Sequence, residues 1–331
     1  MIVEEWKKRI ACVTGASGMV GSRIVQSLLQ QGYTVRALTR RKDLTLSGVD
    51  MSEQRLRRPR CMGLCDMHYG DIRDESVLKS FLNQANILFH CAAELKDESR
   101  MWDVNVAGTE NLLRLIPGAG ITYFCYLSSA GVVGKTERPI VDETSPCNPR
   151  NMYERTKWEA EKRVAKGVNG CCVVVLRPTN VIDERRSGAL VLPMRSGWAD
   201  YLKILLKGGE NAHVIHADDV AAAALYLISH ASENPQCFFV SCDHEPMNTF
   251  AGIWKLYKNF ERAGSFDESG PMVVHLPVAF PHMLRTVMRG ASNRGDTVYS
   301  SKKLLRHGFV FPLGLKGAIR QVIEERGKVT L

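Results

Sequence analysis

The chain has 331 residues, of which 45% are hydrophobic and 24% charged, a composition typical of one large globular domain or a domain with a smaller lobe. No apolar run approaches the roughly 18 residues that span a membrane, and the first ten residues are too charged for a secretory signal, so no membrane partner is expected. The net charge of +9 comes without a nucleic-acid-binding motif, so nucleic acid is not an expected partner either.

The ten cysteines raise the question of disulfides and metal sites. Four of them lie within short apolar runs that resemble buried strands: Cys12, Cys91, Cys125 and Cys172. Cys61, Cys65 and His68 are close in sequence, but no second pair of ligands completes a zinc site. We therefore expect no metal, and reduced thiols in a cytoplasmic protein.

The first half of the chain alternates apolar, strand-like runs with helical periodicity, which indicates βαβ units and a parallel sheet. Strands are expected at residues 9–14, 34–39, 87–91, 123–128 and 172–176, with a further strand closing at 68–69. Helices are expected at 19–31, 76–84, 102–115 and 153–166. This order predicts an α/β fold with a doubly wound (Rossmann) parallel sheet and right-handed crossovers.

After Pro178 the pattern loosens, with a polar loop expected at 183–188. Further helices are expected at 218–230, 250–260 and 315–325, with a strand at 237–241 and a loop at 264–271. We therefore expect a dinucleotide-binding domain at 1–178, to which 210–241 returns. Residues 179–209 and 242–331 would form most of a smaller C-terminal, substrate-binding lobe.

A glycine-rich turn follows the first expected strand and opens the first expected helix. Its glycines have the spacing GxxGxxG, and a backbone without Cβ atoms can approach a pyrophosphate closely. The free N–H groups and the positive end of the helix then meet the phosphate charge. The expected cofactor contacts in this turn are Gly15, Ser17, Gly18, Met19, Val20 and Gly21.

The end of the second expected strand bears on the choice between NAD and NADP. An acidic residue there would bind the ribose 2′-hydroxyl, whereas an arginine accommodates a 2′-phosphate. The sequence places Arg40 and two further cations at this point, with Asp43 just beyond. Guanidinium groups match phosphate oxygens. Arg40 therefore favours NADP, and NAD stays the alternative.

Eight motifs follow one another in a specific order: TGASGMVG at Thr14, GDIRD at Gly70, HCAAE at His90, NVAGTENLL at Asn105, LSSAGVVG at Leu127, YERTK at Tyr153, LRPTNVI at Leu176 and HADDVAAA at His216. With them the chain resembles the extended short-chain dehydrogenase/reductase family, the NAD-dependent epimerase/dehydratase group, from about Arg9 to at least Ala224. Helix-pair dimers are common in that family, so a homodimer is a further expectation.

The resemblance implies a set of cofactor contacts beyond the glycine turn. Asp71 is expected to contact the adenine, Ala92 and Ala93 to line the nicotinamide side, and Asn105 to brace the sheet and the active-site region. The remaining cofactor contacts expected at strand ends are Ile72, Cys91 and Pro178.

The resemblance also places Ser129, Tyr153 and Lys157 on the family's catalytic triad. Tyr153 and Lys157 are four residues apart, so they project from one helix face. A phenol has a pKa near 10, and a neighbouring ammonium and the nicotinamide charge would lower the pKa of Tyr153 towards that of a base. Lys157 would also hold the nicotinamide ribose. Ser129 would hydrogen-bond the substrate oxygen that gains or loses the proton.

The sequence departs from the family pattern at several places, and one of these departures bears on the reaction. The family's dehydratases carry an Asp-Glu pair where this chain has Ala130 and Gly131, which disfavours dehydration. Val133 stands where many relatives have tyrosine. Glu94 is either an extra acid or base, or an exposed loop carboxylate. Net reductases draw on NADPH, so Arg40 favours a reductase or dehydrogenase. An epimerase that recycles its cofactor stays open as an alternative. A non-enzymatic NADP sensor is disfavoured because the chain keeps the catalytic triad.

The substrate is the least determined feature, with a nucleotide sugar or a similar small molecule expected. Sterols and flavonoid-like ketones are substrates of other relatives. The cations expected to meet a pyrophosphate, or else to be surface charge, are Arg185, Arg186 and Arg195. His216 and Arg177 are expected to border the substrate site, and Asp218 to be the N-cap of its helix.

Overall fold

A computed structural model of the chain describes residues 9–40, 63–184, 186, 188–191, 198–232, 235–264, 266, 273–289 and 294–329. The chain divides into two compact units. The first unit comprises Met1–Val132, Pro149–Arg177 and Val220–Phe238, and the second comprises Val133–Asn148, Pro178–Asp219 and Phe239–Leu331. The division expected from the sequence at residue 178 stays a prediction.

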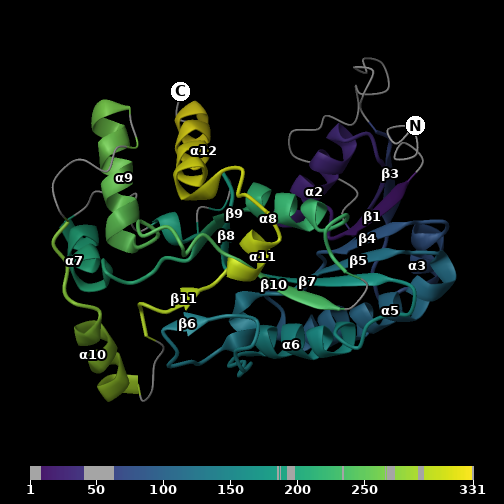
Figure 1. Cartoon of the computed structure of the whole chain (residues 1–331), viewed down its shortest axis with the longest axis horizontal. Coiled ribbons are helices and arrows are strands. Elements are labelled where there is room, and N and C mark those ends of the chain that lie inside the picture. The colour runs from purple at the N-terminus through teal and green to yellow at the C-terminus, as the bar shows by residue number, and fades with distance from the viewer. Residues whose placement is uncertain are drawn as a thin grey trace. The chain divides into compact units, whose positions relative to one another are not determined.

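A seven-stranded sheet forms the centre of the fold, in the order β10-β7-β5-β4-β1-β2-β3 (Figure 1). Its strands are β1 (Ile10–Thr14), β2 (Thr34–Thr39), β3 (Cys65–Tyr69), β4 (Ile87–His90), β5 (Tyr123–Leu127), β7 (Cys172–Pro178) and β10 (Gln236–Val240). The pairings from β3 through β2, β1, β4 and β5 to β7 are all parallel. The chain order reverses between β1 and β4, which is the switch point of a doubly wound sheet. The expected fold class is confirmed.

Helices cover both faces of this sheet (Figure 1). On one face α3 (Glu75–Leu82), α5 (Gly108–Ala119) and α6 (Met152–Val164) share a core with alternate strand residues such as Phe124 and Tyr126. On the other face lie α2 (Met19–Gln30) and α8 (Ala217–Tyr226), and the Tyr123 hydroxyl donates to the carbonyl of Ala224 in α8. Successive side chains of β5 point to opposite faces because a strand has a period of two, and both faces are buried.

The helix expected at 102–115 differs from the structure. It is preceded by α4 (Glu98–Met101), and Trp102–Ala107 forms a π-helical stretch that leads into α5. Such stretches recur at functional sites because they redirect a side chain. Here the widened turn holds Asn105, which is buried.

The second unit contains short strands and amphipathic helices. Its strands form two small parallel pairs, β8 (Asn180–Ile182) with β9 (Val214–His216) and β6 (Ile140–Val141) with β11 (Val298–Tyr299). Its other helices are α7 (Trp198–Lys207), α9 (Phe250–Ala263), α10 (Ala279–Arg289), α11 (Lys302–Arg306) and α12 (Gly314–Val329). Apolar residues of α9 and α12 pack with those of β8 and β9 to form its core. No helix in the described part of the chain is both long and apolar enough to cross a membrane.

Candidate functional site

The glycine-rich turn joins β1 to α2 at the carboxyl edge of the sheet. Gly15 has a φ of +64°, and a Cβ there would lie 2.6 Å from the backbone nitrogen of Ala92. A Cβ on Gly21 would lie 2.2 Å from the carbonyl oxygen of Gly15, so neither position accepts a side chain. Gly18 is exposed and is the N-cap of α2, where no described side chain caps the helix. Exposed backbone beside the uncapped, positive end of a 12-residue helix fits the phosphates of a dinucleotide.

A buried histidine links this turn to the helices beneath it. His90 is fully buried at the end of β4, with Nδ1 2.7 Å from Thr14 Oγ1 and Nε2 2.9 Å from Thr109 Oγ1. Thr109 donates to the carbonyl of Asn105 at 2.6 Å, so it accepts from the Nε2–H of His90, and Nδ1 accepts from Thr14. Burial, together with the nearby charge of Lys157, lowers the pKa of His90 to about 3. His90 is therefore neutral at physiological pH.

Asn105 continues the same network towards α6. Its Oδ1 accepts from the backbone N–H of Glu94 at 2.7 Å, and its Nδ2 donates to the Glu94 carbonyl at 3.1 Å and to Thr156 Oγ1 at 3.0 Å. Thr156 in turn donates to the carbonyl of Tyr153 at 3.0 Å. Asn105 thus ties the loop after β4 to the first turn of α6, which is the bracing role expected for it.

Helix α6 places Tyr153 and Lys157 against the carboxyl end of β5, which Ser129 follows. The Ser129 hydroxyl lies near the phenol of Tyr153 and acts to lower its pKa. The Nζ of Lys157 donates to the carbonyl of Leu127 at 2.5 Å and lies 4.2 Å from the ring centroid of Tyr126. The structure therefore brings together the residues that the sequence places 24 and 28 positions apart.

Burial sets the charge states of this group. It raises the pKa of Tyr153 to about 12, against a lowering by the Ser129 hydroxyl, and the charge of Glu154 raises the pKa further. Burial also lowers the pKa of Lys157 to about 7. Burial therefore outweighs the lowering of the tyrosine pKa that we expected from the neighbouring ammonium. Near pH 7 the phenol is neutral and the amine is close to half protonated.

Sequence analysis missed Glu161, one helical turn beyond Lys157. Its Oε2 accepts from the Ser128 hydroxyl at 2.6 Å, and its Oε1 accepts from Arg177 Nη2 at 2.5 Å. All three side chains are buried, and the Arg177 guanidinium lies 5.8 Å from the ring centroid of Trp158. The ion pair fixes the end of β5 against α6 and β7. The signal in the sequence was the spacing of Tyr153, Lys157 and Glu161 at four and eight residues.

Arg40, the residue expected to select NADP, is half exposed at the end of β2. Its Nη2 lies 3.8 Å from the Oε2 of Glu94. The Oε1 of Glu94 accepts from the backbone N–H groups of residues 95–97, and these bonds, that of Lys96 first, lower the pKa of the carboxyl group together with the charge of Arg40. The Glu94 side chain is only 14% exposed. The expectation of an exposed loop carboxylate is therefore wrong, since Glu94 holds its own loop and faces Arg40.

Asp71 and Ile72 follow β3 at the same edge of the sheet. Both oxygens of Asp71 accept from the guanidinium of Arg73, at 2.9 and 3.0 Å. Burial acts to raise the pKa of Asp71, but the bonds from Arg73 and the charge of Arg40 lower it overall. Ile72 is buried against Gly108, where a Cβ would lie 2.5 Å from its Cδ1.

The remaining expected cofactor residues lie at strand ends and in the glycine turn. Ser17 is exposed and accepts from the hydroxyl of Thr39, the last residue of β2. The residues after β4, which are half-buried, are Cys91, Ala92 and Ala93. Helix α2 opens with Met19, which is half-buried, and Val20, which is buried. Pro178 ends β7 and belongs to the second unit, so its cofactor contact stays a prediction.

The backbone after Ser129 packs closely against the serine. The N–H of Gly131 donates to Ser129 Oγ at 3.0 Å. A Cβ on Gly131 would lie 3.2 Å from that oxygen and 3.3 Å from the Cγ of Glu154. A side chain at this position would therefore require the Ser129 and Glu154 side chains to shift by a few tenths of an ångström. Val133, which replaces the tyrosine of many relatives, is buried.

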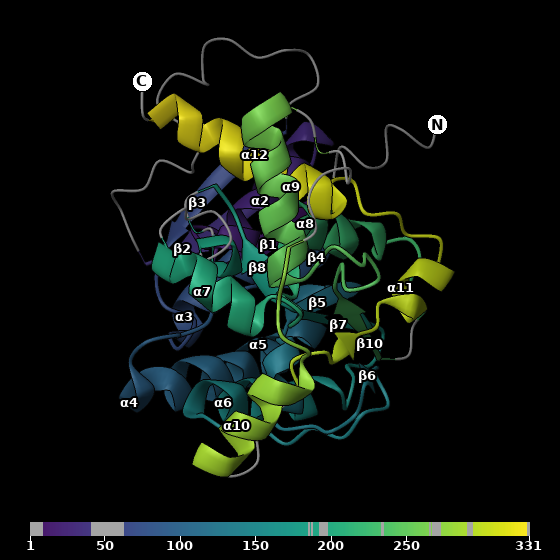
Figure 2. The same ribbon diagram turned by 90° about the vertical axis from the view of Figure 1, so that its left-hand side faces the viewer.

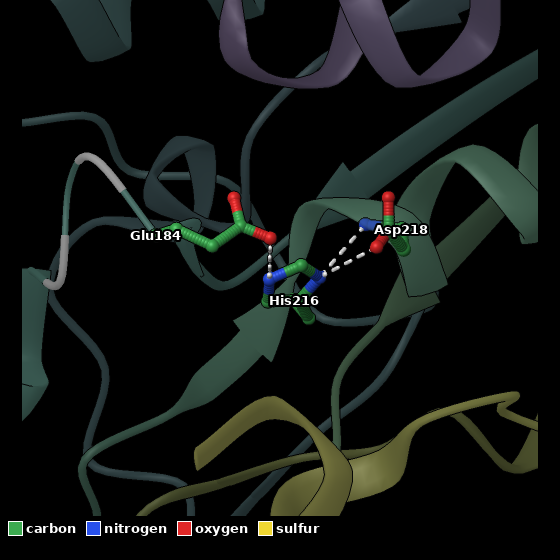
Figure 3. A group of neighbouring side chains, drawn as sticks. All are labelled: Glu184, His216 and Asp218. Atoms are coloured by element: carbon green, nitrogen blue, oxygen red, sulfur yellow. Dashed lines mark hydrogen bonds and ion pairs between the residues drawn. The ribbon is translucent and has the colours of Figure 1, made fainter. Parts of the chain in front are cut away.

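A second group of ionisable side chains lies in the second unit (Figure 3). The imidazole of His216 is buried between two carboxylates, with Nδ1 3.3 Å from Asp218 Oδ2 and Nε2 3.7 Å from Glu184 Oε1. The amide of Gln321 donates to the same two oxygens, at 3.1 and 2.6 Å. The two carboxylates face different ring nitrogens. This geometry is better suited to holding the imidazole in one orientation than to binding one metal ion with all three side chains.

The start of α8 corrects one expectation. Asp218 lies inside the helix and is not its N-cap, and the His216 ring accepts from its backbone N–H at 3.2 Å. The next residue, Asp219, binds the backbone N–H groups of Leu313 and Gly314 instead. Arg186 is exposed, whereas Arg185 and Arg195 lie outside the described residues, as does Asp43.

Comparison with known proteins agrees with this architecture. The sequence profile of the NAD dependent epimerase/dehydratase family matches residues 11–240. The chain belongs to this family, which places it among nicotinamide-dependent enzymes. It is also similar to a solved short-chain dehydrogenase/reductase superfamily protein from Agrobacterium tumefaciens with bound NAD, with a TM-score of 0.70 and 20% identity over 97% of this chain and 98% of that one. At this identity the likeness shows the fold.

Two curated relatives extend the comparison. The chain is 30% identical over 261 residues to a 3 beta-hydroxysteroid dehydrogenase/Delta 5→4-isomerase of Mycobacterium tuberculosis, covering 72% of this chain and 66% of that protein. It is 26% identical over 324 residues to a dihydroflavonol 4-reductase of Hordeum vulgare, covering 90% of this chain and 83% of that protein. The chain thus spans slightly less than two thirds of the length of the mycobacterial relative.

Proposed function

We propose that the protein is a nicotinamide-dependent oxidoreductase that interconverts a secondary alcohol and a ketone on a small molecule. The observation that carries the proposal is the packing of Tyr153 and Lys157, on one face of α6, against the strand end that presents Ser129. Both curated relatives described above are named for oxidation or reduction, which favours net turnover over epimerisation.

In this proposal the chain's own residues bind the substrate and move a proton, while a bound nicotinamide supplies or accepts the hydride. Tyr153 exchanges the proton with the substrate oxygen, and Ser129 hydrogen-bonds that oxygen and fixes its position. Lys157, once protonated, favours the phenolate of Tyr153 and holds the nicotinamide ribose. The buried ion pair of Glu161 keeps α6 in register with β5, so the three groups keep fixed positions relative to one another.

The turn and strand ends hold the cofactor in this proposal, and Arg40 selects NADP. The glycine turn takes the pyrophosphate on the amino end of α2, and Asp71 lies on the adenine side. Because Glu94 already faces the guanidinium of Arg40, a 2′-phosphate would have to replace that carboxylate as its partner. The preference for NADP is therefore a competition between two anions for one arginine.

Titration with NADPH and NADH, followed by nicotinamide fluorescence, tests the choice of cofactor. We expect tighter NADPH binding by the wild type, and about tenfold or greater loss of NADPH affinity in Arg40→Gln, because a hydrogen bond to a charged group is worth about 1.5–3 kcal/mol. NADH affinity should stay within about twofold in this variant. Glu94→Gln should strengthen NADPH binding. Tighter NADH binding by the wild type would show that Arg40 does not select NADP.

Turnover tests the reaction itself. The purified protein is mixed with hydroxysteroids, flavonoid-type ketones and nucleotide sugars while nicotinamide absorbance is followed. Net consumption of the cofactor supports the proposal, and a product formed without net consumption identifies an epimerase. In either case Tyr153→Phe should lower the rate by about 10²-fold or more, since it removes the proton donor. Full activity of Tyr153→Phe would refute the assigned mechanism.

A cytoplasmic location and a homodimer belong to the same proposal. The cysteines of the described part of the chain are free thiols, as a reducing compartment would keep them. Analytical ultracentrifugation of the purified chain tests the dimer, and fractionation of cells tests the location.

A further inference from the structure

Helix α10 turns its apolar side outward. Four side chains recur at the i, i+3, i+4, i+7 spacing of one helix face and are 47, 58, 48 and 80% exposed: Phe280, Met283, Leu284 and Val287. Pro281, on the other side of the helix, is buried. A surface helix of a globular protein normally turns such a face towards the core. Because the apolar side of α10 faces outward, its apolar surface is not buried and does not stabilise the fold.

Helix α7, in the same unit, shows a similar exposed stripe. Its exposed apolar side chains are Trp198, Tyr201, Leu202 and Leu206, of which Trp198 is 84% exposed. The segment that leads into α10 contacts the end of α7, because Leu276 N–H donates to the Leu205 carbonyl at 2.8 Å and Val278 lies against Gly209. Both figures show α7 and α10 as neighbours within this unit (Figures 1 and 2).

The stripes of α7 and α10 belong to the same unit, and we call their exposed apolar side chains, together with Val274 in the segment before α10, the apolar patch. Its members are Trp198, Tyr201, Leu202, Leu206, Val274, Phe280, Met283, Leu284 and Val287. They are nine of the fifteen large apolar side chains that are exposed among the described residues. Single exposed apolar residues are normal, but so many of them on two neighbouring helices of one unit are typical of a binding surface.

The charges carried by the same two segments are almost all positive. Within 198–207 and 273–289 the cations are Lys203, Lys207, Arg285 and Arg289, and the only acidic residue is Asp200. Lys203 and Lys207 are exposed beside Leu202 and Leu206. The whole chain also carries a positive net charge, of +9. A partner that fits this surface therefore has an apolar interior covered by a negatively charged outer layer.

We propose that the apolar patch binds the surface of a bilayer that contains anionic phospholipid. An amphipathic helix that has an apolar side of Phe, Met, Leu and Val and carries cations in its sequence lies in the plane of such an interface and inserts the apolar side among the acyl chains. Trp198 and Tyr201 are the residue types enriched at the level of the headgroups. This binding is independent of the proposed reaction, and it differs from a membrane span.

A second copy of the chain fits the patch less well. Lysine is depleted from the buried centres of protein interfaces, whereas at a membrane its stem lies along apolar surface and its ammonium reaches the phosphates. The cytoplasmic leaflet carries a negative surface potential that attracts clustered cations. Lys203 and Lys207, placed between apolar side chains, therefore favour lipid over protein as the occupant.

Co-sedimentation of the full chain with vesicles tests the proposal. One set contains phosphatidylcholine alone, and the other contains one third phosphatidylserine. We expect at least about tenfold stronger binding to the anionic vesicles, weakened by salt. The double variant Met283→Ser/Val287→Ser should lower this binding by about tenfold or more, and Lys207→Glu should lower it by several fold. Val310→Ser, at a site 78% exposed outside the patch, is the matched control and should bind as the wild type does.

The same samples distinguish a lipid bilayer from a second copy of the chain as the partner of the apolar patch. Absence of wild-type binding to either set of vesicles, or equal binding to both sets, would overturn the proposal. So would a wild-type dimer that Met283→Ser/Val287→Ser converts to monomers while vesicle binding persists, since the patch would then join two copies. Thermal unfolding and NADPH titration of each variant confirm that it is folded, and their results bear on the proposed oxidoreductase separately.

Discussion

Replacement of Lys157 by methionine should stabilise the protein, and by an amount that depends on pH. Burial lowers the pKa of this amine from its ordinary value of 10.5 to about 7. At 1.36 kcal/mol for each pKa unit, keeping the charged form buried costs about 5 kcal/mol below pH 7. The unfolded chain binds the proton up to pH 10.5 and the folded chain only to about pH 7, so this cost declines as the pH rises between these values.

Methionine has a similar length and no charge, so Lys157→Met removes the cost. Between pH 6 and pH 9 the charge-related part falls from about 5 to about 2 kcal/mol, and the stability gained by the variant should fall by about 3 kcal/mol. Urea unfolding of both proteins at the two pH values measures this difference. Lys79→Met is the control, since Lys79 is 63% exposed and its pair with Glu75 contributes at most about 1 kcal/mol.

An equal gain at pH 6 and pH 9 would refute the reasoning, because it would show that Lys157 titrates as an exposed lysine does. A loss of stability at both values would show that the hydrogen bond to Leu127 outweighs the cost of burial. Under the proposed function the same substitution removes a catalytic group. Increased stability with lost turnover is therefore the combined expectation for Lys157→Met.

Three further substitutions test the packing around the site. Glu161→Gln leaves Arg177 as an uncompensated buried charge and should lower the free energy of unfolding by about 3–5 kcal/mol, measured in urea; a loss below about 1 kcal/mol would contradict this. Gly21→Ala places a Cβ 2.2 Å from a backbone oxygen, so NADPH titration should show at least about tenfold weaker binding, and unchanged binding would mean that the turn can shift. Asn105→Leu should cost about 1–3 kcal/mol by leaving backbone groups of Glu94 unpaired, and a neutral effect in urea would show that this loop repacks.

The parallel sheet and the position of the triad could be predicted because both depend on local patterns. Apolar runs fixed β1, β2 and β5 to within one residue, since buried parallel strands are apolar on both faces. The triad followed from motif order, and α6 carries Tyr153 and Lys157 on one face whatever surrounds it. Neither inference required knowledge of a contact distant in the sequence.

The second unit could not be predicted in the same way. Strands such as β6 (two residues) and β9 (three residues) are too short to show a period, and their partners lie far along the chain. Helix α10 has a clear amphipathic pattern. However, Pro281 lies in its first turn, and because proline usually breaks a helix, its presence argues against a helix when the sequence is considered alone. Which side of such a helix faces outward depends on tertiary packing, which no local pattern contains.

The electrostatics of the site were the part furthest from the sequence. Sequence reasoning paired Tyr153 with an ammonium and expected a lowered pKa, but burial raises the tyrosine pKa and lowers that of Lys157, so each group resists its charged form. A buried lysine persists only where other bonds offset its cost. The carbonyl of Leu127 and the ion pair of Glu161 one turn away, which also acts to raise the lysine pKa, offset part of it. The fold thus holds Lys157 near the midpoint of its titration, where a small change in local charge moves its proton.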